Sequence, residues 1–508
     1  MDKRVEFSNC RQIKLNWQTN IGMHDSWPLK PGDRIFRPRR IKRYRLRRVL
    51  GVSALFSAGY GNVGSSIYYA LGIVALVAIG ATPLALGIAG ILFIFTALTY
   101  AEGTAMFPEA GGSASFARHG FNDAVGFTAG WALMLSYIVT ISISAYTIPP
   151  YLGYFWEPFK DSPIIGTAAS MGIVIFLMTI NVIGVRETSI LNIGAAIIDI
   201  TTQVSLVVIG FILLLNPVVL VHRIIANWPT FDNLILGIAL ASIAYTGIET
   251  MSQMAEETRQ PEKRVPKSLV MMIVTVLVVF AGISLVSLSA MTPQELASEW
   301  SRDPIAGIAA NLPVVLLRVV LKPLIAILAG TILLIATNAG LMGISRLAFS
   351  LGSHRLVPPV LSRVHYQFKT PYVSIILFSI IALFILSPGF FAADVFKNMG
   401  TLYAFGSLLA FMFAHASILS LRARKPELPR PFKLGWNIRL KGYEMPVSAI
   451  LGLAATSIIW LILLVTQPYS RWVGLVWMVA GLIIYYLYRR KKHMPLTHTP
   501  GEHLPEEV

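Results

Sequence analysis

Two interruptions in otherwise apolar segments carry the residues most suited to binding chemistry. Gly59–Ser66 contains three glycines and an asparagine, which weaken a helix, and Ala244–Ile248 contains one glycine. Non-helical backbone at membrane depth persists only where it lines protein or a water-filled cavity. Close packing through small residues is the other interpretation. One interruption in each half of the chain favours a binding site.

The two interruptions predict complementary contacts for one small ligand. The amides of the first would begin the second half of a helix, where unpaired N–H groups and the helix dipole favour a carboxylate. The carbonyl groups of the second would accept hydrogen bonds from an ammonium group. The predicted substrate-binding residues are Gly64, Ser65, Ser66, Ala244, Tyr245, Thr246, Gly247 and Ile248.

Acidic residues inside apolar segments are the candidates for ion coupling, because charge at membrane depth is costly. Asp199 lies mid-segment among isoleucines. Burial favours the protonated carboxyl group, so Asp199 is predicted to carry a proton. Ligation of sodium by an ionised Asp199, or a purely structural pairing with a helix end, are the alternatives. Glu249 follows the second interruption and is suited to reading a substrate side chain or relaying a proton, whereas Glu102 is assigned a structural role.

The segments that position these residues are membrane helices. The chain has 508 residues, of which 55% are hydrophobic and 13% charged, with a mean hydropathy of +0.66. A soluble domain carries about 25% charged residues. Spans of about 20 apolar residues recur along the whole length, so we predict an all-α integral membrane protein in a lipid bilayer. The twelve predicted spans are roughly 49–77, 82–107, 122–152, 164–184, 192–216, 232–256, 268–290, 318–350, 372–388, 393–421, 446–466 and 470–488.

The basic residues predict the orientation of these spans. With the N-terminus in the cytoplasm, 35 of the 42 Lys and Arg residues fall on the cytoplasmic side. The positive-inside rule therefore places both termini in the cytoplasm of a cell-membrane protein. This topology explains the net charge of +17 without any nucleic-acid partner. The predicted parts are a basic tail over 1–48, a membrane domain of twelve helices over 49–490 and a C-terminal tail over 491–508.

The sequence predicts no enzyme, cofactor or metal site. No phosphate-binding loop of the Gly-x-x-x-x-Gly-Lys-Ser/Thr type is present, and no metal-ligand spacing is found. The one cysteine, Cys10, lies in the predicted cytoplasmic tail. A single cysteine cannot form an intrachain disulfide. A partner protein linked by an extracellular disulfide, a heavy chain, is not expected either, because Cys10 is predicted to be cytoplasmic.

The chain resembles the amino acid/polyamine/organocation transporter superfamily over roughly residues 45–490. Several short motifs in family order carry the resemblance, with Ser66 in place of the second glycine of a Gly-x-Gly break in helix 1. The motifs are Val63–Tyr68, Tyr100–Glu102, Phe107–Gly112, Tyr245–Glu249 with Glu256–Thr258 and Pro261, Ser345–Leu347 with Val364–Tyr372, Asn398–Leu402 and Leu428–Phe432.

The resemblance implies the leucine-transporter fold, a 5+5 inverted repeat with discontinuous helices 1 and 6. The spacing of the two interruptions, five helices apart, agrees with such a repeat. The resemblance also implies amino acid permease activity: alternating access, an amino-acid-like substrate, and proton-driven symport or exchange. It places Tyr245 as an aromatic lid over the substrate, and Asp199 where many proton-coupled relatives have a lysine.

The predicted function is secondary active transport of amino acids or related amines. The partners are then a small-molecule substrate and a coupling ion, with a proton favoured over sodium. A potassium-like inorganic cation importer of the same fold is an alternative, although Ser53 and Ser136 stand where such relatives have acids. A non-transporting membrane sensor is the other alternative.

Overall fold

The computed structural model describes residues 48, 50–184, 189–392, 394–440 and 442–499. The predicted tail 1–48 lies outside them except for Arg48, and so do Cys10 and residues 500–508 of the predicted C-terminal tail. The described residues belong to one compact unit.

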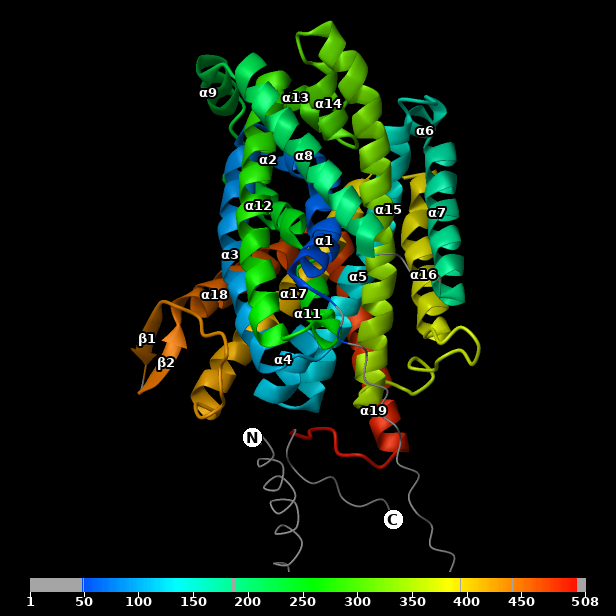
Figure 1. The fold of residues 1–508 in the computed structure, drawn as a ribbon, viewed down its shortest axis with the longest axis vertical. Helices are drawn as coiled ribbons and strands as arrows, with labels where there is room; N and C mark the ends of the chain where they lie inside the picture. The colour runs from blue at the N-terminus through cyan, green and yellow to red at the C-terminus, as the bar shows by residue number, and fades with distance from the viewer. Residues whose placement is uncertain (1–47, 49, 185–188, 393, 441, 500–508) are drawn as a thin grey trace, which may run out of the picture. The chain divides into compact units, whose positions relative to one another are not determined.

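Twelve membrane spans are present in the described ranges, as the sequence predicts. Figure 1 shows their arrangement. Their bounds are Val52–Val63 (α1), Gly64–Ser66 (η1) and Ile67–Ala78 (α2) for span 1, Thr82–Met106 (α3), Asp123–Leu152 (α5), Pro163–Ile183 (α7), Ser189–Leu213 (α8), Phe231–Ala241 (α10), Ser242–Tyr245 (η3) and Glu249–Gln253 (α11) for span 6, Pro261–Ala290 (α12), Val315–Ser353 (α15), Tyr372–Leu386 (α16), Val395–Arg424 (α17), Val447–Thr466 (α18) and Pro468–Lys491 (α19).

The first two spans form one helical stretch of 55 residues, Val52–Met106. A straight α-helix of that length would extend about 80 Å, whereas the hydrocarbon core of a bilayer is about 30 Å thick. The chain folds back at the 3-10 turn Ile79–Ala81 (η2), where Ile79 has a φ of 45°. The eleven apolar stretches found in the described residues therefore contain twelve spans.

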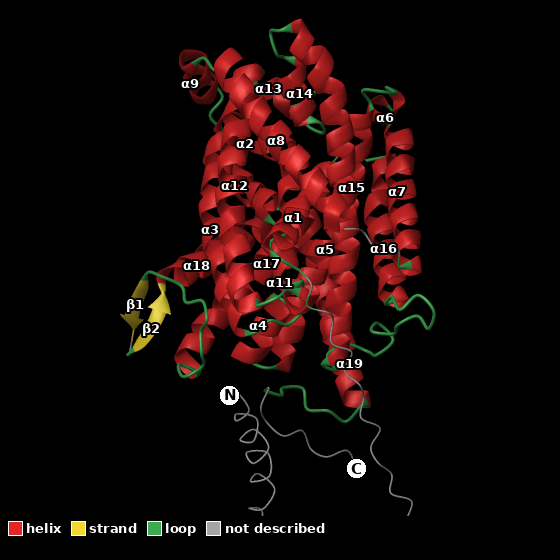
Figure 2. Ribbon diagram, in the orientation of Figure 1, coloured by secondary structure: helices red, strands yellow, loops and turns green. Residues whose placement is uncertain are grey.

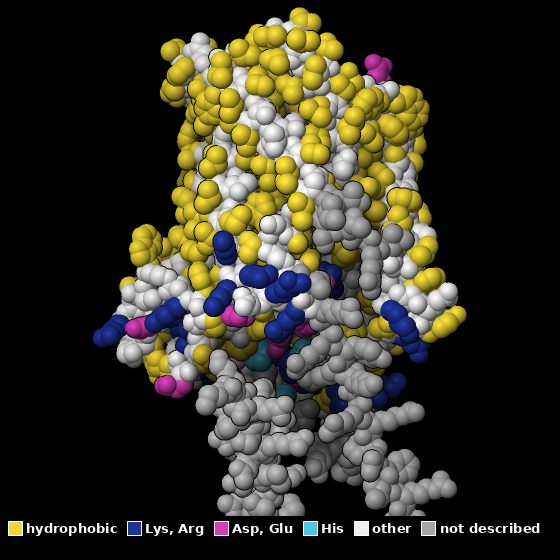
Figure 3. Space-filling view, viewed as in Figure 1, with side chains coloured by type: hydrophobic (Ala, Val, Ile, Leu, Met, Phe, Trp, Pro, Cys, Tyr) yellow, Lys and Arg dark blue, Asp and Glu magenta, His cyan; other side chains and the backbone are white. Residues whose placement is uncertain are grey.

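The short elements gather at the two ends of the helix bundle (Figures 1 and 2). We call one end the basic end, because Lys and Arg side chains concentrate there in Figure 3, below a belt of hydrophobic side chains. It carries α4 and the antiparallel β1–β2 hairpin. The opposite end carries α6, α9, α13 and α14. We call it the lid end, because α13 and α14 pack over α2 there. The bounds are Ser113–Gly120 (α4), Pro158–Asp161 (α6), Pro217–Ala226 (α9), Ala255–Glu257 (η4), Pro293–Ala297 (α13), Pro304–Ala310 (α14), Ser387–Phe390 (η5), Asn437–Leu440 (β1) and Tyr443–Pro446 (β2).

The packing places the interrupted helices inside the bundle. Helix α5 is surrounded by α4, α15 and α17, and most of its side chains are buried. The first helix of each half packs against the fifth helix of the same half: α1 against α8, and α10 against α17. Large apolar side chains remain exposed on the outer helices, such as Ile212 at 74% and Val465 at 72%. Contact with lipid is favourable for such side chains, whereas contact with water would be unfavourable.

A buried ion pair ties α3 to the chain around α17. The Arg422 guanidinium donates two hydrogen bonds to the Glu102 carboxylate, at 2.8 and 2.7 Å, and the backbone N–H of Leu434 donates a third at 2.8 Å. Arg430 lies 3.6 Å from the same carboxylate. Glu102 and Arg422 are almost fully buried, so each charge depends on the other. These contacts agree with the structural role expected for Glu102.

Replacing Glu102 by Gln is expected to lower stability by about 3–5 kcal/mol, because it leaves the Arg422 charge buried without its partner. The measurement is thermal unfolding of the detergent-solubilised protein. Lys433→Gln is the control, since Lys433 and Glu444 form an exposed pair on the same side of the molecule. That change should cost less than about 1 kcal/mol. Equal effects would contradict the assignment.

Candidate functional site

Span 6 is interrupted at Thr246 and Gly247. The 3-10 turn η3 ends at Tyr245, Thr246 is extended with φ −81° and ψ 159°, and Gly247 has a φ of 106°. Only glycine adopts that φ readily, so this residue permits the break. The Gly247 N–H donates to the Glu249 carboxylate at 3.0 Å. Within the described residues, no hydrogen bond reaches the carbonyl oxygens of Tyr245 and Thr246.

Span 1 is less disrupted than the sequence predicts. Its backbone stays in the right-handed helical region, and η1 is only a tightened 3-10 turn between α1 and α2. The Gly64 N–H, predicted to be unpaired, donates to the Tyr60 carbonyl group. In this structure the Gly64 amide is therefore paired within the helix, and the binding role of the Gly64–Ser66 amides stays a prediction. The glycines here permit close packing instead: Gly59 lies against Met251, and Gly61 against Ile335.

The two interruptions meet through Asn62. A Cβ atom on Gly247 would lie 2.8 Å from the Asn62 Cγ atom, and Asn62 Nδ2 donates to Thr250 Oγ1 at 2.9 Å. Asn62 Oδ1 is buried and makes no hydrogen bond to the described residues. The structure thus brings the interruptions of spans 1 and 6 together, through Asn62 of the first and Gly247 of the second. Asn62 and Thr250 join the candidate site, although neither is in the list of predicted substrate-binding residues.

The serines beside this contact have hydrogen-bond partners of their own. Ser65 Oγ and Ser66 Oγ donate to the Asn62 carbonyl group at 3.0 and 3.2 Å, and Ser66 Oγ shares a hydrogen bond with the Tyr69 hydroxyl at 2.9 Å. All three side chains are buried. Their hydroxyl groups are therefore satisfied by the protein in this structure.

Tyr245, for which the family resemblance implies a lid role, packs against neighbouring helices in this structure. Its hydroxyl donates to the Leu86 carbonyl group on α3 at 2.8 Å. Its ring stacks on Phe93 at a centroid distance of 5.2 Å and lies 5.4 Å from the ring of Phe280. The side chain is 3% exposed and packs between α3 and α12. In this structure Tyr245 is a packing residue with a satisfied hydroxyl.

Asp199 is held by neutral donors on three elements. Tyr60 and Tyr68, which flank η1, donate their hydroxyl hydrogens to Asp199 Oδ2 and Oδ1 at 3.1 and 2.7 Å. Gln203, one turn along α8, donates to Oδ2 at 2.7 Å. Asp199 is 1% exposed. None of these three donors is among the residues predicted from the sequence, and Tyr60 and Tyr68 lie more than 100 residues from Asp199 along the chain.

Glu249 is the second buried carboxylate near the interruptions, also 1% exposed. Among the described residues, no Lys, Arg or His forms an ion pair with Glu249 or Asp199. Four tyrosines, one each on α2, α3, α5 and α17, lie close enough to Glu249 to interact with its carboxylate electrostatically. They are Tyr69, Tyr100, Tyr137 and Tyr403.

Several polar atoms around Glu249 have no satisfactory partner. In the described part of the chain, the hydroxyl groups of Tyr100, Tyr137 and Tyr403 and both amide atoms of Gln253 are buried without a well-formed hydrogen bond. Tyr137 lies beside Thr250, but the geometry falls short of a hydrogen bond. Buried polar groups are normally satisfied, and unsatisfied ones mark functional sites. This cluster therefore resembles a binding region more than a packed core.

Both ends of the bundle are closed over this region. At the lid end, Lys160 pairs with Asp303 at 2.8 Å. Burial raises the pKa of the Asp303 carboxyl to about 6, while the charge of Lys160 acts to lower it, so this carboxyl is largely ionised at neutral pH. At the basic end, Arg346 pairs with Glu257 at 2.9 Å. This pair joins η4 to α15.

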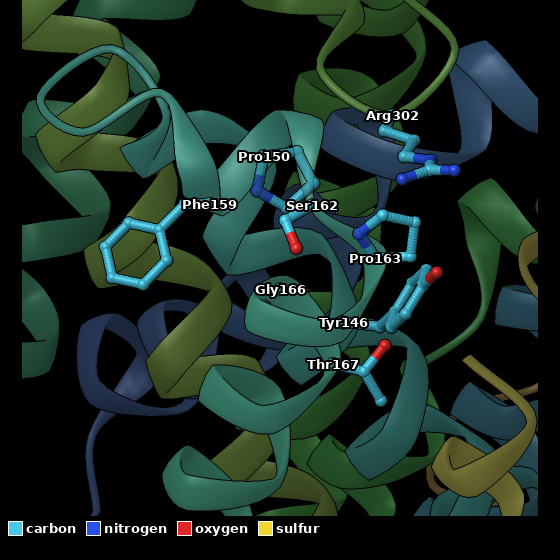
Figure 4. A pocket seen from close by; sticks show the side chains of 8 residues that line it. All are labelled: Tyr146, Pro150, Phe159, Ser162, Pro163, Gly166, Thr167 and Arg302. Atoms are coloured by element: carbon cyan, nitrogen blue, oxygen red, sulfur yellow. The ribbon is translucent and has the colours of Figure 1, made fainter. Parts of the chain in front are cut away.

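A small pocket at the lid end is separate from the interruptions (Figure 4). It lies between α5, the start of α7 and Arg302, and residues such as Tyr146 and Thr167 line it. None of the predicted substrate-binding residues contributes to its wall. The candidate site is therefore the polar region around Asn62, Asp199, Gly247 and Glu249.

Replacing Gly247 by Ala is expected to destabilise the protein by about 2–4 kcal/mol and to abolish uptake, because the strained φ adds to the clash with Asn62. Thermal unfolding and uptake in proteoliposomes check both. Gly442→Ala is the matched control, since Gly442 has a φ of 86° with nothing within 4 Å of the added Cβ. If the Gly247→Ala variant kept full uptake, the interruption at Gly247 would not be part of the binding site.

Replacing Tyr245 by Phe is expected to cost about 1 kcal/mol of stability, the net value of its hydrogen bond to Leu86. The substrate concentration for half-maximal uptake should stay unchanged. A raised half-maximal concentration with unchanged stability would restore the lid role of Tyr245.

Comparison with known proteins places this architecture. The family model described as "Amino acid permease" matches residues 50–487. The chain is 27% identical to the branched-chain amino acid permease BcaP of Bacillus subtilis, over 88% of this chain and 94% of that protein. It is 27% identical to the methylthioribose transporter of the same species, with the same coverage, and 24% identical to the low-affinity putrescine importer PlaP of Escherichia coli, over 87% of this chain and 93% of that protein. The chain belongs to the amino acid permease family, within the amino acid/polyamine/organocation superfamily.

Proposed function

We propose that this permease moves an amino acid or a related amine across the cell membrane by alternating access, with a proton as the coupling ion. The observation that carries the proposal is the pair of buried carboxylates, Asp199 and Glu249, beside the helix interruptions and without ion-paired cations among the described residues. Charges at membrane depth are retained where they have a task. Two separate carboxylates provide one group for the substrate and one for the ion.

The substrate lies between the two interruptions in this proposal. The free carbonyl groups of Tyr245 and Thr246 accept from its ammonium group, and Glu249 supplies the negative charge behind them. A substrate carboxylate is held at η1 by the hydroxyl groups of Ser65 and Ser66, whose present acceptor is a carbonyl group. The amides of Gly64–Ser66 join these contacts if the 3-10 turn opens on binding. Ala244, Gly247 and Ile248 shape the wall.

The charges favour a substrate that carries an amine. An anion without an ammonium group would face the field of two carboxylates with no described cation to offset it. Relatives named for branched-chain amino acids, for glutamate and serine, for putrescine and for methylthioribose span several substrate types, so they support a broad class rather than one side chain.

Asp199 is the coupling group in this proposal. Its three hydrogen-bond donors stabilise the ionised form, and the absence of a described ion-pair partner leaves it free to exchange a proton during the cycle. Sodium is the competing ion, because Gln203 Oε1 is a buried oxygen without a partner in the described residues. If the proton is the coupling ion, a proton gradient alone drives uptake and a sodium gradient alone does not. If sodium is the coupling ion, the reverse holds.

The basic end faces the cytoplasm in this proposal. The Lys and Arg residues at that end follow the positive-inside rule, and the start of α1 and the end of α19 both lie there. The lid end is then the outer end. This orientation places the tails 1–48 and 491–508 in the cytoplasm, on either side of a transporter domain over 49–490.

Uptake of labelled amino acids and amines into proteoliposomes tests the function. Accumulation driven by an inward proton gradient, or exchange against preloaded substrate, is the expected result, and candidates are first ranked by ligand-induced thermal stabilisation. No uptake and no exchange for any amino acid or amine would reject the proposal. Uptake of potassium or rubidium instead would favour the inorganic cation alternative.

Replacing Asp199 by Asn is expected to reduce proton-driven uptake by about tenfold or more, a coupling effect within the usual range. Exchange should be less affected, because it needs no net proton movement. Asp232→Asn is the matched control, since Asp232 lies in the first turn of α10 and is exposed. If Asp199→Asn keeps full proton dependence, or only a sodium gradient drives uptake, proton coupling at Asp199 is wrong.

A further inference from the structure

A lid made of residues 291–310, with α13 and α14, covers α2 at the outer end. The contact is made by backbone: a Cβ atom on Gly72 would lie 1.8 Å from the Ser301 carbonyl oxygen. The lid is also fixed from the side, because Lys160 pairs with Asp303 and lies 4.1 Å from the centroid of the Trp300 ring. The lid is therefore closed on the half of span 1 that follows η1.

Tyr151 joins this lid to α2. It lies near the outer end of α5 and is 1% exposed. Its hydroxyl donates to the Tyr68 carbonyl group at 2.8 Å and accepts from the Ile305 N–H, in the first turn of α14, at 3.4 Å. Its ring meets the ring of Tyr68 edge-on at 5.4 Å. A single hydroxyl group thus contacts α2 and the lid at once.

Tyr68 continues the connection to the coupling carboxylate. Its backbone receives the Tyr151 hydroxyl, and its own hydroxyl donates to Asp199 Oδ1 at 2.7 Å. Two side chains therefore separate the lid backbone from Asp199. The groups that face Asp199 are Tyr60 from α1, Tyr68 from α2 and Gln203 from α8, so the Tyr68 contact is the one that leads towards the lid.

We propose that Tyr151 is a positioning residue which, through Tyr68, links closure of the outer lid to the charge on Asp199. The inference rests on the proposed function in that it takes Asp199 as the coupling group. A hydrogen bond to an ionised carboxylate is stronger than one to a neutral acid. The ionised form of Asp199 holds Tyr68, and with it the Tyr151 bridge and the lid. Neutralising Asp199 loosens Tyr68 and favours opening.

Cysteine labelling from outside measures lid opening directly, without reference to transport. The chain has one cysteine, so Cys10→Ser gives a cysteine-free background. Ser65→Cys then places a thiol at a fully buried position below the lid. A membrane-impermeant maleimide applied to cells reaches it only through an open outer end. Gly72→Ala serves as the positive control, because its methyl group prevents closure against Ser301.

In this background Tyr151→Phe should raise the labelling rate about fivefold or more, because it removes the hydroxyl that bonds to both Tyr68 and Ile305, and one hydrogen bond contributes about 1 kcal/mol. Asp199→Asn should raise it by a similar factor, and the double variant should add little to either single change. Tyr146→Phe, on the same helix but lining the pocket of Figure 4, should leave the rate unchanged. Tyr68→Phe removes the hydrogen bond between Tyr68 and Asp199 and should raise the labelling rate as Tyr151→Phe does. Agreement between the two variants shows that the effect does not come from a folding defect in one of them.

The link is overturned if Tyr151→Phe and Tyr68→Phe fold normally and leave labelling unchanged, or if the effects of Tyr151→Phe and Asp199→Asn multiply in the double variant. Those results would leave proton-driven uptake, and hence the proposed function, intact. Conversely, an Asp199→Asn protein that keeps its proton dependence removes the coupling role, whatever the labelling shows. The two failures are therefore distinguishable.

Discussion

A peptide group that leaves the helix inside a membrane finds no water to bond with, so its N–H and C=O groups need partners within the protein or from a ligand. At the span 6 interruption, Glu249 satisfies the Gly247 N–H, and the neighbouring carbonyl groups remain available. This requirement brings a carboxylate to the bundle centre. The surrounding tyrosines of α2, α3, α5 and α17 follow from it, because only polar groups suit a buried charge.

Strong and weak contacts are distributed unequally over the bundle. The ion pair of Glu102 with Arg422 ties α3 to the chain around α17, and Asp123 with Arg489 ties α5 to α19 through a second buried pair at 2.7 Å. By contrast, neutral hydroxyl groups connect α1 and α2 to α8 and the lid. Neutral hydrogen bonds contribute about 1 kcal/mol each, far less than the loss from breaking a buried ion pair. The two halves of span 1 are therefore held to α5 and α8 by weaker contacts than the two buried ion pairs, while the Lys160–Asp303 pair fixes the lid from the side.

The sequence predicts the spans well, because hydropathy over about 20 residues reports burial in lipid directly. It also locates Asp199 and Glu249, since a charge at membrane depth is visible without a structure. It does not show which interruption takes the strained backbone: the three glycines of Gly59–Gly64 permit close packing, while the single Gly247 takes the positive φ. Glycine content alone does not separate these two uses. Tyr245 and the partners of Asp199 depend on helix rotation and contacts distant in sequence, which hydropathy does not encode.

The neutral surroundings of Asp199 have an electrical consequence. An ionised Asp199 solvated by two tyrosines and a glutamine carries its whole charge into the bilayer, since no described cation cancels it. A charge that crosses the full membrane field gains or loses about 2.3 kcal/mol per 100 mV. In the proposed proton-coupled cycle, the membrane potential acts on this charge when the empty carrier returns, and a proton bound at Asp199 removes the contribution of that carboxylate. Under that proposal, the voltage of a resting cell biases the protein as well as the pH gradient does.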